Sequence, residues 1–179
     1  MKPHDRKWAQ RKNVQPNKDR EIIEYSTFPD TQKRETDHIP PLASGDIRII
    51  HLGGVEEIGR NMSMIEYKDT ILVVDCGVQF TETNTPGIDF ILPNTRYLEE
   101  HKHKIKGVLV THGHLDHIGS FPYIMPRIGN PPVYARLFTS LMIKKRQEEF
   151  PHLAPITLNV IEKGDTVTLG DLKVRFFGV

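Results

Sequence analysis

Short runs of alternating or uninterrupted apolar residues recur along this 179-residue chain, each closed by polar or glycine-containing turns. Alternation with a period of two is typical of strands with one buried face, and short β-branched runs are typical of fully buried strands. The turns at Lys68–Asp69, Lys163–Asp165 and Gly170–Asp171 separate neighbouring runs. Strands are therefore expected over residues 46–52, 62–67, 71–77, 105–111, 157–161, 166–169 and 172–177.

Two segments have helical spacing of their apolar residues instead. Residues 117–127 form the first, with Asp116 as the expected N-cap and Pro122 limiting where a regular helix begins. Residues 134–150 form an amphipathic helix that should pack on a sheet through one apolar side. That side consists of Leu137, Phe138, Leu141 and Met142. Strands followed by loops and helices indicate an α/β (α+β) fold.

The first 44 residues differ in composition from the rest. They hold five prolines, dense charge and few apolar residues, which predicts a disordered, charged N-terminal tail before a folded domain over residues 45–179. Residues 1–20 contain seven Lys or Arg against two acidic residues. Such a tail is suited either to steering the protein to RNA through its phosphates or to solvating the chain without a specific partner.

Composition narrows the setting of the protein. The chain has no apolar run long enough to span a membrane and no hydrophobic secretory signal, so we expect a cytoplasmic protein that does not engage a membrane. Its single cysteine, Cys76, has no partner for an internal disulfide and ends an apolar run, which predicts a buried thiol. A net charge of +1 does not bear on nucleic-acid binding, which depends on local patches.

Residues 111–117 read Thr-His-Gly-His-Leu-Asp-His, at the end of the expected strand 105–111. Imidazole nitrogens suit zinc and related cations, and a carboxylate adds an anionic ligand. In extended chain, side chains two apart share a face, so His112 and His114 can hold one cation, while Asp116 and His117 lie beyond the turn. Two half-sites are implied. Asp75 also ends a strand, where it either accepts a hydrogen bond from a ligand histidine or caps the turn.

A glycine-rich loop covers residues 53–61 between two expected strands. No Gly-Lys-Ser/Thr follows it, so a nucleotide-binding loop is disfavoured. Tight turning near residues 111–117, which we call the metal loop, explains the glycines better. Lys144–Arg146 is interpreted as a solvated helix face, with RNA contact as the alternative. The remaining histidines are interpreted as surface or structural residues: His4, His38, His51, His101, His103 and His152.

Four segments together resemble a known family: His51–Asn61, Val74–Gly77, Gly87–Pro93 and Val110–Gly119. Over residues 46–179 the chain is similar to the N-terminal portion of bacterial ribonuclease J, in the β-CASP branch of the metallo-β-lactamase superfamily. The histidine motif alone would indicate only the superfamily. The glycine-rich loop and the Gly-Ile-Asp segment narrow the resemblance to ribonuclease J.

The resemblance implies an αββα sandwich with two metal ions, usually zinc, at one edge of its sheets. His112 and His114 would ligate the first zinc, Asp116 and His117 the second, and Asp75 would support the site. The implied activity is 5′-to-3′ exonucleolytic and endonucleolytic hydrolysis of RNA by a metal-activated water, in a homo-oligomeric protein. Leu115 stands where family members often have Glu, at a position that is not a ligand.

In that family a further ligand histidine, a bridging aspartate and another histidine follow a strand like residues 172–179, and a β-CASP insert covers the RNA. Because the sequence stops there, we expect the N-terminal half of such a domain, with two protein ligands for each metal and doubtful activity alone. The alternatives are a hydrolase of a small thioester or lactam, and a non-catalytic half-domain that needs a partner chain.

Overall fold

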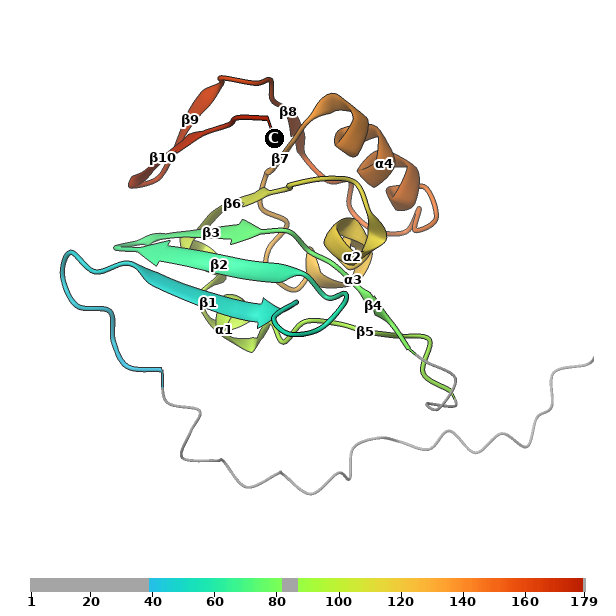
Figure 1. Cartoon of the computed structure of the whole chain (residues 1–179), viewed down its shortest axis with the longest axis horizontal. Coiled ribbons are helices and arrows are strands. Elements are labelled where there is room, and N and C mark those ends of the chain that lie inside the picture. The colour runs from blue at the N-terminus through green and yellow to red at the C-terminus, as the bar shows by residue number, and fades with distance from the viewer. Residues whose placement is uncertain (1–38, 82–86, 179) are drawn as a thin grey trace, which may run out of the picture. The chain divides into compact units, whose positions relative to one another are not determined.

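A six-stranded mixed sheet forms the centre of the computed structural model, which describes residues 39–81 and 87–178 (Figure 1). The first three strands in sheet order form an antiparallel meander, and β3, β6, β7 and β8 run parallel to one another. In sheet order the strands are β1 (Arg48–Gly53), β2 (Met62–Tyr67), β3 (Thr70–Val74), β6 (Ile105–Leu109), β7 (Val133–Ala135) and β8 (Leu158–Val160).

Two small antiparallel pairs accompany this sheet. β4 (Gln79–Phe80) pairs with β5 (Phe90–Ile91), and β9 (Thr166–Leu169) pairs with β10 (Leu172–Arg175). The second hairpin is tied to β3 at its turn, where the Asp171 backbone N–H donates to Thr70 Oγ1 at 2.8 Å.

The helices are short apart from one. α1 (Arg96–Glu100) is followed by a 3-10 turn over Lys102–Lys104, and α2 (Leu115–Ile118) and α3 (Phe121–Ile124) follow β6. α4 (Leu137–Gln147) connects β7 to β8. Figure 1 shows α2 and α3 beyond the edge of the sheet at which β3 and β6 end.

The core lies between the sheet and these helices. Inward residues of β2 alternate with half-buried ones, while β3 and β6, in the middle of the sheet, are buried on both faces. The core consists of Met62, Met64, Ile71, Val73, Cys76, Leu98, Ile105, Val108, Val110, Ile118, Phe121, Ile124, Met125, Ile128, Val133, Ala135 and Ile143.

One acidic side chain is buried at the far end of β2. Glu66 is 2% exposed and accepts hydrogen bonds from Arg48 at 2.9 Å, Tyr97 at 2.6 Å and Lys104 at 3.3 Å. Burial raises the pKa of Glu66, but these hydrogen bonds outweigh it and hold the pKa below its usual value. The network fixes α1 and the start of β6 against β1 and β2.

The strands expected from periodicity are present, with small shifts in their ends. β2 and β9 match residues 62–67 and 166–169, whereas β6 ends at Leu109 and β3 at Val74, short of the predicted ends. The expected α/β class is confirmed.

The helices differ more from the expected ones than the strands do. Instead of one helix over 117–127, α2 and α3 are separated at Gly119 and Ser120, because Pro122 in the first turn of α3 lacks an N–H. Asp116 is not the N-cap: His114 is, and Asp116 lies in the first turn of α2. Residues 133–135 form strand β7, so the long helix begins at Leu137.

The expected packing face of that helix was wrong. α4 buries the small polar side chains of Thr139 and Ser140 together with Ile143. Ser140 Oγ donates to the carbonyl oxygen of Ala135, which holds the helix close to β7. The four apolar residues expected to pack on the sheet are 40–72% exposed: Leu137, Phe138, Leu141 and Met142.

The chain divides into residues 1–40 and residues 41–179, and the fold described here belongs to the second part. The predicted charged tail over residues 1–44 lies outside the described residues up to residue 38, and residues 39–44 contain no helix or strand. Among the described residues, no helix has the length and apolarity that crossing a bilayer requires.

Candidate metal centre

The candidate site lies where the parallel strands β3 and β6 end side by side. The Asp75 backbone N–H donates to the carbonyl oxygen of Leu109 at 2.9 Å and thereby joins the two strand ends. Residues 110–114 continue beyond β6 without regular structure and lead into α2. The carboxyl ends of parallel strands are where α/β proteins commonly carry functional side chains.

Three imidazoles gather in this loop. The ring centroids of His112 and His117 are 4.0 Å apart, and those of His112 and His114 are 4.8 Å apart in an edge-on arrangement. Burial lowers the pKa of His112 below its usual value, and the neighbouring rings of His117 and His114 lower it further. Neutral imidazole is the form that binds metal ions, so this environment favours ligation.

Asp75 orients the loop from the end of β3. Its Oδ1 accepts the Thr111 backbone N–H at 2.8 Å, and its Oδ2 accepts from His117 Nδ1 at 2.8 Å. The Thr111 hydroxyl donates to the same carboxylate at 2.9–3.0 Å. Of the two roles considered for Asp75, the contact with a candidate ligand histidine is present, and the other contacts of its carboxylate go to Thr111 beyond β6. The φ of Asp75, 61°, lies in the left-handed region, which Asp tolerates better than most residues.

Asp116 lies on the other side of His117. Its Oδ2 is 3.4 Å from His117 Nε2, and both atoms contact the Asn61 side chain. Asn61 is the last residue of the glycine-rich loop, and in the sequence it stood out only as part of that motif. Nothing in its own position along the chain indicates this contact, because 55 residues separate it from Asp116.

The glycine-rich loop is wound tightly against the metal loop. Gly54 and Gly59 have φ of +86° and +102°, and a Cβ on Gly53 would lie 2.4 Å from the carbonyl oxygen of Arg60. A Cβ on Gly77 would lie 1.6 Å from the carbonyl oxygen of Asp116. The expectation of tight turning near the metal loop is confirmed, and glycine at these positions permits the close approach.

The donor types match a divalent cation, since three imidazoles and a carboxylate are the groups that bind zinc and related metals. With Nδ1 of His117 facing a carboxylate, its Nε2 lone pair faces Asp116 and Asn61. Over residues 39–81 and 87–178, however, no group of three or more His, Cys, Asp or Glu side chains is arranged to hold a metal ion. The contacts among the candidate ligands are those of His112 with His114 and His117, and of His117 with Asp116.

The other sequence candidates lie outside this cluster. His51 Nδ1 is 2.8 Å from Ser63 Oγ on an exposed part of the sheet, and His101 stacks on Tyr97. His103 and His152 are exposed, and His4 and His38 lie outside the described residues. Cys76 is fully buried, as expected, and burial raises the pKa of its thiol.

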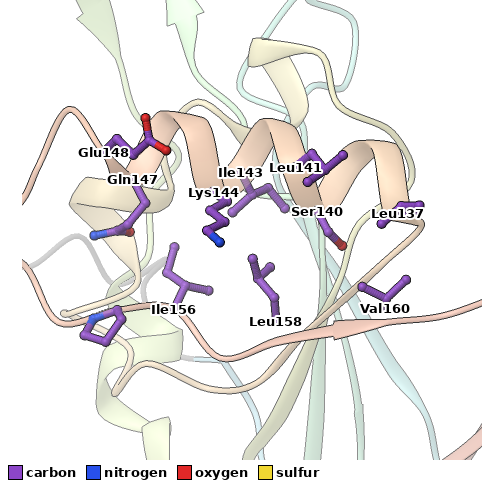
Figure 2. A pocket seen from close by; sticks show the side chains of 11 residues that line it. Leu137, Ser140, Leu141, Ile143, Lys144, Gln147, Glu148, Ile156, Leu158 and Val160 are labelled. Atoms are coloured by element: carbon purple, nitrogen blue, oxygen red, sulfur yellow. The ribbon is translucent and has the colours of Figure 1, made fainter.

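A separate groove runs between α4 and residues 155–160 (Figure 2). Its volume is about 550 Å³, and apolar side chains such as Leu141, Ile156 and Leu158 line it, with Gln147 and Glu148 toward one end. Lys144 points into it from α4. Its lining residues include none of the candidate metal ligands.

Comparison with known proteins identifies relatives. The family model of the metallo-beta-lactamase superfamily matches residues 55–178. Ribonuclease J of Corynebacterium glutamicum is 38% identical over 141 residues, which is 78% of this chain and 19% of that protein. Ribonuclease J of Mycoplasma pneumoniae is 44% identical over 102 residues, 56% of this chain and 18% of that protein. The chain thus spans about a fifth of the length of these relatives.

Among solved structures, a protein of unknown function from Enterococcus faecalis has a TM-score of 0.51 and 17% identity, covering 71% of this chain and 36% of that one. This likeness concerns the fold alone.

Proposed function

The chain belongs to the metallo-β-lactamase superfamily, and from this we propose that it functions in a metal-dependent ribonuclease of the ribonuclease J type, of which it forms part of the metal-binding domain. The proposed reaction is hydrolysis of RNA phosphodiester bonds, both from the 5′ end and internally. The proposed cofactors are two zinc ions, and the proposed assembly is a homo-oligomer.

The observation that carries the proposal is similarity to proteins named ribonuclease J over a stretch of the chain that takes in the candidate metal loop. A match that takes in 78% of a 179-residue chain must include residues 111–117, wherever it begins. The gathering of three histidine rings within 4.0–4.8 Å supports a hydrolytic centre at that loop. RNA as the substrate rests on the names of the relatives.

We assign His112 and His114 to one metal ion, and Asp116 and His117 to the second. Bound divalent cations supply Lewis acidity, which brings the pKa of water close to neutrality and offsets negative charge on the phosphate.

The protein groups around the ligands have separate tasks. The Asp75 carboxylate keeps a proton on His117 Nδ1, so that Nε2 presents its lone pair to the site. Thr111 links Asp75 to His112, because its hydroxyl donates to the Asp75 carboxylate and lies 3.1 Å from His112 Nδ1. None of these side chains needs to be the nucleophile.

The test uses the native gene product at its natural length, stripped of metal by a chelator and then supplied with Zn²⁺ or Mn²⁺. The substrate is a 5′-monophosphorylated RNA with a fluorescent label at its 3′ end. We expect metal-dependent cleavage that His114→Ala and Asp116→Asn abolish. His103→Ala is the matched control, because His103 is exposed and outside the cluster, and it should leave the rate unchanged.

The same preparations should be offered an acyl thioester and a β-lactam. Turnover of either compound without RNA cleavage would refute the ribonuclease proposal and favour a small-molecule hydrolase of the same superfamily.

A further inference from the structure

Asn61 connects the glycine-rich loop to the candidate metal ligands through its backbone. Its N–H donates to the carbonyl oxygen of Asp116 at 3.0 Å, and its own carbonyl oxygen accepts the Gly77 N–H at 3.0 Å. The residue before it, Arg60, has a φ of 53°, so the chain turns sharply just ahead of Asn61. The Asn61 backbone is therefore held to α2 through its N–H and to the segment after β3 through its carbonyl oxygen.

The Asn61 side chain adds three contacts to the same loop. Nδ2 lies 3.1 Å from the Asp116 carbonyl oxygen, 3.1 Å from Asp116 Oδ2 and 3.2 Å from His117 Nε2. The amide oxygen lies against Gly54, where a Cβ would be only 2.4 Å from it. The glycine thus leaves room for the oxygen, and the donor side of the amide faces the two candidate ligands.

These contacts complete the hydrogen bonding of His117. A carboxylate only accepts, so the Nδ1 that lies 2.8 Å from Asp75 Oδ2 carries the proton. In the neutral ring the other nitrogen, Nε2, is then an acceptor, and the Asn61 amide is a donor 3.2 Å away. Asp75 and Asn61 therefore favour the same tautomer from opposite sides of the ring. Asp116 Oδ2 lies farther away, 3.4 Å from Nε2, and accepts from the Asn61 amide at 3.1 Å.

We propose that Asn61 is a positioning residue for the second metal half-site: its amide keeps the Nε2 lone pair of His117 and the carboxylate of Asp116 directed toward each other before a cation binds. The amide lies among the acceptor atoms that a divalent cation would use, and a bound cation would replace its contact with Nε2. This inference rests on the proposed assignment of Asp116 and His117 as metal ligands.

Two substitutions separate the amide from the backbone contacts of Asn61. Asn61→Ala removes the side-chain donor and keeps the backbone N–H and carbonyl. Asn61→Asp keeps the size of the side chain but places an acceptor against Nε2 and Asp116 Oδ2. Asn159→Ala is the matched control, because Asn159 is likewise half-buried and donates through Nδ2 to a backbone carbonyl, that of Val133 at 3.3 Å.

The first measurement is the nitrogen-15 NMR spectrum of the histidine rings in the metal-free full chain. We expect His117 to be in the Nδ1–H form in the wild type and Asn159→Ala, and to shift toward the Nε2–H tautomer in Asn61→Asp. An unchanged His117 spectrum in Asn61→Asp would overturn the proposal. The NMR comparison uses Asn61→Asp, so it tests the proposal even if Asn61→Ala does not fold.

The second measurement is calorimetric titration with Zn²⁺. Asn61→Ala should bind zinc about tenfold more weakly than the wild type, in the range found for residues that orient metal ligands. Asn159→Ala should bind like the wild type. Affinity in Asn61→Ala equal to or above that of the wild type would overturn the proposal while leaving the ribonuclease function standing. A wild type that binds no zinc would instead count against the metal assignment, with the NMR result still testing Asn61.

Discussion

Gly77 is the point of closest approach between the end of β3 and the metal loop, and Gly77→Ala is the substitution with the clearest steric consequence. A Cβ at this position would lie 1.6 Å from the Asp116 carbonyl oxygen, 2.3 Å from its carbon and 2.8 Å from the Asn61 nitrogen. Cβ atoms in proteins essentially never come within 3.0 Å of such atoms. All three neighbours are backbone atoms, so no side chain can rotate away.

The structure sets the size of the effect. The Asp116 carbonyl must retreat by at least 1.4 Å, the difference between 1.6 and 3.0 Å. Two hydrogen bonds from Asn61 end on this carbonyl oxygen, one from the backbone N–H at 3.0 Å and one from Nδ2 at 3.1 Å, and such a movement takes them beyond bonding distance. Their loss costs about 2 kcal/mol. Overpacking adds about 1–3 kcal/mol. We expect a loss of roughly 3–5 kcal/mol, a large part of the stability of an ordinary domain.

Equilibrium unfolding in urea, followed by circular dichroism, measures this loss. Gly113→Ala is the control within the same loop, because its nearest atom would be Met142 Cγ at an ordinary 3.4 Å, and its free energy of unfolding should stay within about 0.5 kcal/mol of wild type. A Gly77→Ala variant within about 1 kcal/mol of wild type would refute the packing described for this loop.

Three further predictions follow from buried polar groups. Asp75→Asn should weaken Zn²⁺ binding by about 10–100-fold in calorimetry, because the amide no longer fixes His117 as a charged acceptor does, and unchanged affinity would contradict that role. Glu66→Gln should lower the free energy of unfolding at neutral pH by about 1–3 kcal/mol. Because the pKa of Glu66 is lower in the folded chain than in the unfolded one, this difference should be complete above about pH 4.3 and shrink as the pH falls further. Urea unfolding at neutral and acid pH checks the sign, and a difference that grows on acidification would contradict it. Cys76 should not react with a thiol reagent in the native chain and should react fully in denaturant, whereas rapid native labelling would show that this part of the core opens.

Periodicity predicted the sheet well because its strands are simple cases. β2 alternates between buried and half-buried residues, and β3 and β6 are short runs rich in Ile, Leu and Val that are followed by polar residues. The donor types of the metal loop could also be predicted from the sequence, since His112, His114, Asp116 and His117 lie within six consecutive positions.

The spacing of the apolar residues in α4 did not predict which face of the helix packs on the sheet. The helix approaches the sheet through Thr139 and Ser140, whose small side chains allow close contact, and this leaves Leu141 and Met142 outside. A three-residue strand such as β7 is too short to show a period, so it merged with the helix that follows.

The orientation of the candidate ligands depends on residues far away in the sequence. Asp75 reaches His117 across 42 positions because β3 and β6 are parallel neighbours, and Asn61 reaches it across 56 because the glycine-rich loop folds over the end of β3. A local motif therefore supplies the donor atoms, while the sheet pairing decides which nitrogen of His117 carries the proton. If the proposed metal assignment holds, substitutions that loosen the packing of the glycine-rich loop should alter metal affinity without changing any candidate ligand.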